Sequence, residues 1–295
     1  MALSVLPQKI EILKGVCEPI MRKAFSFSAT VNEIEWRGRF FSLSNSFIQR
    51  VTLTAVILFV PLVAFSQTAS TSPIPRASDG KPDFSGYWQV ISTANWNIQD
   101  HSAEKGVPGG QGIVVGNEIP YQPWAIAKKK ENYENRATAD PEVKSYFPGV
   151  PRVTYTPFPF QIVQTPKETA ILYEYVHAVR HLHTDGTNHP SGHIDWWFGD
   201  SRGHWDGDTL VVDITDFNDQ TWFDRAGNFH SDALHVVERY KFIDADHIDY
   251  EATIEDPKVF TKPWKIDVVI YRHKEKNFQL LDYEGYAFDY EKYYP

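Results

Sequence analysis

Five of the eleven histidines in this chain fall within one short stretch, between His177 and His193. In the segment VRHLH, His181 and His183 are two residues apart, so their side chains would share one face of a β-strand. Two imidazoles at this spacing can bind one metal ion, and His189 in the following loop could supply a third ligand. The pattern predicts a divalent-metal site, for instance zinc, at His181, His183 and His189. The alternative is a set of solvated histidines at a strand end and in a polar loop.

A second group of polar residues lies around the segment DRAGNFH. Asp224 and His230 could act as a general base, with His235 on the next strand as a further acid–base candidate. Alternation along that strand places Glu238 on one face and His235 with Arg239 on the other. If the second face points inward, Arg239 could bind an anionic ligand. The alternative is a network of acidic and arginine side chains that fixes the preceding loop to the sheet.

Aromatic residues make up 15% of the chain, with nine tryptophans among them. This exceeds what a core of this size usually needs, so some of these side chains could line a cavity for an apolar or ring-bearing molecule. The alternative is that they are ordinary core residues. The candidate ligand-binding tryptophans are Trp88, Trp196, Trp222 and Trp264.

A mainly β structure must position these side chains. Short runs of β-branched and aromatic residues alternate with turn signals such as DGD and AGN, which is typical of an antiparallel meander. Strands of this number predict one domain that closes as a barrel, although two packed sheets would give the same pattern. One helix is expected near residues 124–137, where Ala, Lys and Glu prevail. The predicted strands are 84–90, 160–164, 170–177, 179–184, 194–198, 209–215, 234–243, 248–255, 266–272 and 279–286.

An apolar run, VTLTAVILFVPLVAF, precedes this domain. It is shorter than the roughly 20 residues that span a bilayer and is typical of a signal peptide. We expect cleavage between Ser66 and Gln67, a periplasmic or secreted product, and no membrane span in the mature chain. The predicted organisation is a leader at 1–66 with its apolar region at 51–65, a flexible linker at 67–82 and a single β-rich domain at 83–295.

Composition excludes several classes of protein. The only cysteine, Cys17, lies in the leader, so the mature chain has no thiol for catalysis, disulfides or metal binding. A formal net charge of −9 predicts a surface that repels nucleic acid. The 19 prolines and the aromatic content argue against a coiled coil or a disordered chain. Nothing in the sequence indicates the number of subunits.

Two resemblances extend this interpretation. The triplet Gly86-Tyr87-Trp88 resembles the G-x-W of lipocalins, in which the tryptophan closes the floor of an antiparallel barrel. Longer segments of the mature chain resemble a widespread family of exported, uncharacterised bacterial proteins, a resemblance that implies export but no particular activity. These segments are PFPFQIVQTP, GDTLVVDITDFND and DRAGNFHSDALHVVERY.

Two functional hypotheses follow. In the first, the protein binds a small hydrophobic or aromatic molecule in a lipocalin-like barrel cavity. In the second, it is a hydrolase or lyase that acts on such a molecule, using a metal or the His/Asp residues named above. A closed apolar cavity would favour binding, whereas histidines and carboxylates converging in one cleft would favour catalysis.

Overall fold

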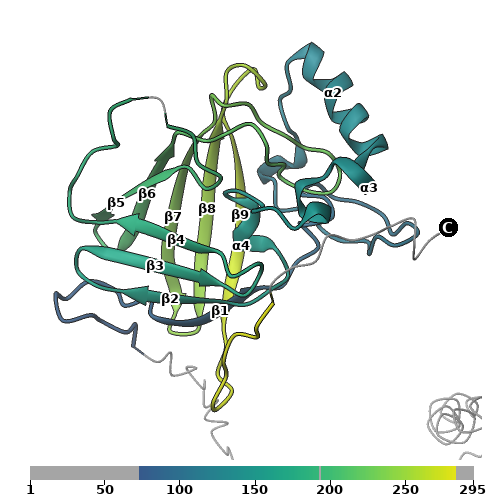
Figure 1. The fold of residues 1–295 in the computed structure, drawn as a ribbon. Helices are drawn as coiled ribbons and strands as arrows, with labels where there is room; N and C mark the ends of the chain where they lie inside the picture. Colours follow the sequence, from purple (N-terminus) through teal and green to yellow (C-terminus); the bar gives the residue numbers. More distant parts are fainter. Residues whose placement is uncertain (1–72, 193, 284–295) are drawn as a thin grey trace, which may run out of the picture. The chain divides into compact units, whose positions relative to one another are not determined.

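The computed structural model describes residues 73–192 and 194–283, which belong to one compact unit. They form a closed barrel of nine strands in sequence order, which confirms the predicted lipocalin-like barrel (Figure 1). Strands β2 to β4 cross the front of the barrel at a steep angle to β7 and β8 (Figure 1). The predicted leader lies outside the described residues. None of the helices in the described part of the chain has the length and apolar character needed to cross a membrane.

The strands alternate between side chains that face the barrel interior and side chains that face outward. In β8, for example, every second residue is buried, as expected for a sheet with one wet face. The strands are β1 (Gly86–Val90), β2 (Phe160–Gln164), β3 (Glu168–Tyr173), β4 (Val179–His183), β5 (Asp200–Asp206), β6 (Thr209–Thr215), β7 (His235–Asp244), β8 (His247–Glu255) and β9 (Trp264–Arg272).

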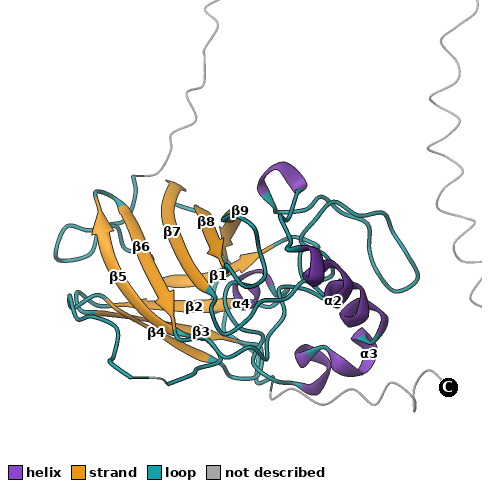
Figure 2. Ribbon diagram, turned by 90° about the horizontal axis from the view of Figure 1, so that it is seen from above, coloured by secondary structure: helices purple, strands orange, loops and turns teal. Residues whose placement is uncertain are grey.

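Helical segments gather beside one end of the barrel (Figure 2). The predicted helix near 124–137 is confirmed as α2 (Pro123–Glu134), which begins with a proline at its first position. Shorter segments accompany it, and α4 is entirely buried. They are η1 (Val115–Asn117), α3 (Arg136–Ala139), η2 (Pro141–Lys144) and α4 (Arg152–Tyr155).

The barrel is mixed and not purely antiparallel, because β4 and β5 run parallel. The strand predicted at 194–198 is wrong: this segment makes only an isolated bridge from Trp196 to Phe217. The chain instead crosses from the end of β4 to the start of β5, as a parallel pair requires. The strand predicted at 279–286 is absent from its described part, 279–283, and its remainder lies outside the described residues.

One end of the barrel, which we call its floor, forms around Trp88. The indole is fully buried, donates from Nε1 to the carbonyl of Phe84 at 2.8 Å, and lies under the guanidinium of Arg272, 4.0 Å from the ring centre. Residues 73–82, expected to belong to a flexible linker, run against this floor. Arg76 forms a two-bond ion pair with Asp208 at 2.6 and 2.7 Å, so this segment is held on the barrel.

Candidate functional site: a polar cluster inside the barrel

Charged side chains lie inside the barrel, where only apolar ones would be expected. The guanidinium of Arg180 on β4 donates to both carboxylate oxygens of Glu238 on β7, at 3.1 and 2.8 Å, and both side chains are fully buried. It also donates to the hydroxyl of Ser201 on β5 at 3.2 and 3.0 Å. Two tyrosine hydroxyls complete the shell of the carboxylate: Tyr250 donates at 2.6 Å and Tyr240 at 3.2 Å. We call these five residues the inner cluster.

The inner cluster carries no net charge, because one arginine faces one carboxylate. Burial acts to lower the pKa of Arg180, but the charge of Glu238 outweighs it and raises this pKa above its ordinary value. A buried ion pair of this kind rarely stabilises a fold more than well-packed apolar residues would. Its presence in a barrel core therefore suggests recognition of something polar.

Two hydroxyls next to the inner cluster make no well-aligned hydrogen bond with the described residues. They belong to Tyr173 on β3 and Thr154 on α4, which are 4% and 1% exposed. They lie near each other, and the hydroxyl of Tyr173 also lies near Arg180. Burial raises the pKa of Tyr173 to about 12, so its hydroxyl stays protonated and can donate. Because buried polar groups are nearly always hydrogen-bonded, these two hydroxyls have hydrogen-bonding capacity that their neighbours use only in part.

An aromatic series leads from this place to the surface. The ring of Tyr173 lies 6.4 Å from that of Phe198, which lies 5.2 Å from that of Phe147. Beyond them, Trp197 packs edge-on against the half-exposed Tyr146 at 5.5 Å. We call Tyr146, Phe147, Trp197 and Phe198 the rim aromatics. They connect the barrel interior to solvent through ring surfaces.

A small void of about 10 Å³ remains beside Tyr240, large enough for no more than a single water molecule. Its walls are otherwise mostly apolar and come from Phe84, Ile162, Thr169, Ile171, Leu182 and Leu210. A ring-sized guest could enter this space only if side chains or strands moved.

Buried ion pairs also fix the segments that close the upper end of the barrel. Arg152 on α4 donates to both oxygens of Asp140 at 2.8 and 3.0 Å and to Glu142 at 2.6 Å. Glu142 in turn accepts two bonds from Arg225 at 2.8 and 2.9 Å. Burial acts to raise the pKa of Glu142, but the arginines outweigh it and lower this pKa. These contacts hold the loop of Arg225 against η2 through Glu142, whereas the alternative stated above had this loop fixed to the sheet.

The structure does not bring the three predicted metal ligands together. His181 is exposed and contacts Glu168, while His189 contacts Asp200 and Asp213. The side chain of His183 contacts neither Glu168 nor the two aspartates. Among the described residues, no group of three His, Cys, Asp or Glu side chains is arranged to hold a metal ion.

His189 instead joins a group of charged residues on the outer face of the barrel. Its Nδ1 lies 2.7 Å from Asp200 and its Nε2 lies 2.9 Å from Asp213. Asp213 also contacts Nε2 of His235 at 2.8 Å, and Asp200 accepts two bonds from Arg202. We call these five residues the outer cluster. Burial acts to raise the pKa of both aspartates, but their hydrogen bonds outweigh it and lower the pKa of each.

The three predicted acid–base residues lie in three different environments. His235 belongs to the outer cluster, so the face of β7 that carries it and Arg239 points outward and not inward; Arg239 pairs there with Asp206 at 3.0 Å. His230 is buried and accepts from the Thr221 hydroxyl at 2.6 Å while donating to the carbonyl of Ser231. Asp224 is hydrogen-bonded to Asn228 and to the amide of Ile98.

Asp224 makes stability depend on pH. Its complete burial raises its pKa to about 6, although hydrogen bonds from Ile98 and Asn228 oppose the shift. The folded protein therefore holds this proton more tightly than the unfolded chain. The resulting stability is fully present below about pH 4 and is lost as the pH rises through about 6. Compared with Asp224→Asn, the wild-type protein should lose up to about 3 kcal/mol of unfolding free energy over this interval.

Urea unfolding of both proteins at pH 4, 5, 6 and 7 checks this expectation. Other titrating groups, including the buried His230, are common to both proteins and cancel in the difference. A difference that stays constant across the four pH values would show that Asp224 does not ionise in this range.

The four predicted ligand-binding tryptophans do not line one cavity. Trp88 lies in the floor, while Trp264 packs edge-on against Phe223 at the other end. Trp196 and Trp222 are partly buried in the segments between strands at that end. Of these positions, only the segment of Trp196 adjoins the rim aromatics.

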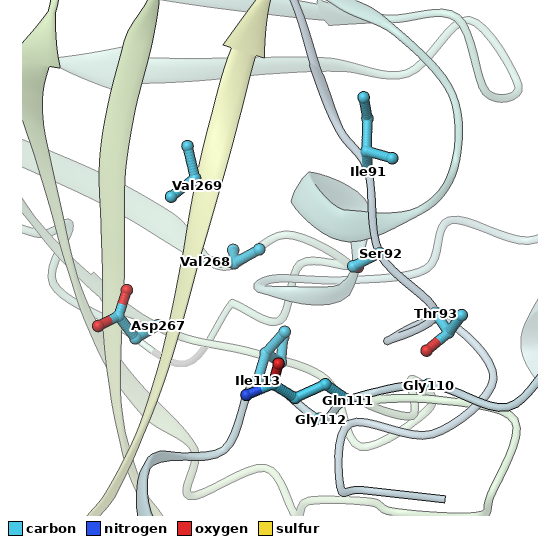
Figure 3. A pocket seen from close by; sticks show the side chains of 10 residues that line it. All are labelled: Ile91, Ser92, Thr93, Gly110, Gln111, Gly112, Ile113, Asp267, Val268 and Val269. Atoms are coloured by element: carbon cyan, nitrogen blue, oxygen red, sulfur yellow. The ribbon is translucent and has the colours of Figure 1, made fainter. Parts of the chain in front are cut away.

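A shallow groove of about 420 Å³ lies outside the barrel, where the chain leaves β1 (Figure 3). Ile91, Gly112, Val268 and Val269 contribute to its walls, and one carboxyl, Asp267, stands at its edge. Partial burial, and then the neighbouring Asp249 and Glu251, raise the pKa of Asp267. The hydroxyl of Thr93 in its wall is buried without a hydrogen-bond partner among the described residues, but the lining residues include no buried ion pair, so the inner cluster is the better candidate for a binding site.

With this geometry established, comparison with protein-family models, curated proteins and solved structures found no match. Only the residues of this chain therefore indicate its function.

The sequence also contains a pattern that indicates the inner cluster, which none of the predicted sites uses. Arg180 shares one face of its strand with Leu182, and Glu238 shares one face of its strand with Val236 and Tyr240. A charged residue on the apolar parity of a strand must point into the core. Two such residues of opposite charge on different strands are an ion-pair candidate, which only the barrel topology could pair.

Proposed function

We propose that this is an exported binding protein whose barrel holds a small ring-bearing molecule with a neutral hydroxyl or carbonyl group. The observation that carries the proposal is the buried, net-neutral inner cluster beside the hydroxyls of Tyr173 and Thr154, which make no well-aligned hydrogen bond. Export is supported by the apolar run at 51–65, which is typical of a signal peptide.

The charge balance of the site selects the ligand class. Glu238 already occupies the fork of Arg180 with two hydrogen bonds, so an anionic guest would place a second negative charge beside a buried carboxylate. A neutral group that exchanges hydrogen bonds with Tyr173 and Thr154 avoids that cost. The apolar walls beside Tyr240 and the rim aromatics suit a ring.

The catalytic alternative has less support. Histidines and carboxylates do converge, but they do so in the outer cluster, on the outward face of β5 to β7. Both ring nitrogens of His189 are occupied by carboxylates there, so this side chain is a poor general base.

A matched pair of probes tests the proposed function. Calorimetry should show that p-cresol binds about tenfold more tightly than toluene, because only the phenol can form hydrogen bonds with the hydroxyls of Tyr173 and Thr154. Tyr173→Phe should abolish most of this preference, whereas Tyr271→Phe, which alters a tyrosine on the outer surface, should leave it intact. Equal affinity for both probes, or no binding of either, would contradict the proposal.

A further inference from the structure

One seam of the barrel is much weaker than the others. β4 and β5 share a single registered pair, His183 with Arg202. Every other neighbouring pair of strands has at least three. Few backbone hydrogen bonds therefore hold this seam, and separating its strands should cost less than separating any other pair.

Side chains from the inner cluster close the seam on its inner side. Arg180 on β4 donates to the hydroxyl of Ser201 on β5, across the gap between the strands. The rim aromatics adjoin the same place, because Phe198 lies just before β5 and its ring approaches that of Tyr173. An opening of the seam would thus lead directly to the hydroxyls of Tyr173 and Thr154.

The outer cluster closes the seam from outside. The chain at residues 184–192 and 194–199 crosses over between the two strands, and His189 in this crossover contacts Asp200 and Asp213 on β5 and β6. Arg202 on β5 donates to Asp200 and, at 2.6 Å, to Thr187 in the crossover. These groups are partly exposed, and such pairs are individually weak. They can hold the crossover in place and still release it.

We infer that the β4–β5 seam is the gate through which a guest reaches the barrel interior, and that the outer cluster is its latch. This inference rests on the proposed function for the identity of the guest. It would give a ring-sized guest a way into an interior whose void beside Tyr240 measures only about 10 Å³. Opening the seam moves β4 and β5 apart while the antiparallel remainder of the barrel stays paired.

Two measurements without any ligand test the gate. In the unmodified protein, the amide hydrogens of β4 and β5 that face the seam should exchange at least about tenfold faster than those that pair with β3 and β6, which stay bonded when the seam opens. In a Cys17→Ser background, Ser201→Cys introduces a single thiol at the seam. Its reaction with a small thiol reagent reports opening, and His189→Ala should accelerate it about tenfold, because two latch contacts are removed.

Lys265→Ala is the control, because it removes an exposed ion pair with Glu251 on the antiparallel β8–β9 pair. It should leave the labelling rate unchanged. The gate is overturned if the seam-facing amides of β4 and β5 are protected as strongly as those that pair with β3 and β6, if His189→Ala does not accelerate labelling, or if Lys265→Ala accelerates it equally. Asp213→Asn provides a second latch variant should His189→Ala fold poorly.

The gate and the proposed function can fail separately. If the seam opens as expected but neither p-cresol nor toluene binds, the gate stands and the proposed function fails. If p-cresol binds with the expected preference but latch variants leave labelling unchanged, the function stands and the guest must enter elsewhere.

Discussion

Replacement of Arg180 by alanine is expected to lower the unfolding free energy by about 3–5 kcal/mol. The substitution leaves the carboxylate of Glu238 fully buried with only tyrosine hydroxyls as partners. Removing one partner of a buried pair costs far more than the pair contributes, because the remaining charge stays desolvated. Urea unfolding at pH 7 measures the loss directly.

The double variant Arg180→Met/Glu238→Leu provides the matched comparison. It replaces both charges by apolar groups of similar size, and it should recover most of the stability lost in Arg180→Ala. It should keep most of the preference for p-cresol over toluene, because the hydroxyls of Tyr173 and Thr154 remain. If the double variant is as unstable as the single one, the ion pair itself stabilises the barrel and the argument for recognition weakens.

Replacement of Trp88 by alanine is expected to cost about 3–5 kcal/mol of unfolding free energy. The indole is fully buried, donates a hydrogen bond to Phe84 and packs against Arg272, so its removal opens a large cavity in the barrel floor. Thermal and urea unfolding should both show the loss.

Trp124→Ala is the control for that prediction, because the Trp124 side chain is 55% exposed on α2. It should change the unfolding free energy by less than about 1 kcal/mol. If the two substitutions cost the same, Trp88 does not hold the floor in the way its contacts indicate. A large loss of stability in Trp88→Ala would show that Trp88 acts in the core. That role differs from the ligand-binding role predicted for it.

Many strands could be predicted because their physics is local. The segment from His247 to Glu255 alternates in polarity at period two, and Asp206-Gly207-Asp208 is a strong turn signal, so β8 and the β5–β6 hairpin turn were within reach. β5 itself was missed because its inward residues, Ser201 and Gly203, are small and resemble a loop. The aromatic pair at 196–197 resembled a strand, although these residues pack against the rest of the protein from a crossover.

The candidate site was harder to predict because its members come from distant parts of the chain. Arg180 and Glu238 are 58 residues apart, and each is an ordinary charged residue in its own segment. The histidines attracted attention by their density, yet the structure directs His181, His189 and His235 to the outer face, where they contact carboxylates.

The sequence by itself determined the mainly β class, the position of α2, most of the strands and the burial of Trp88, because these depend on periodicity, propensity and turn residues within short segments. Only the tertiary structure decided that β4 and β5 run parallel, that one arginine and one glutamate meet inside the barrel, and that the hydroxyls of Tyr173 and Thr154 lie beside them. Such features depend on closure of the barrel, which brings together residues whose local sequences contain no information about each other.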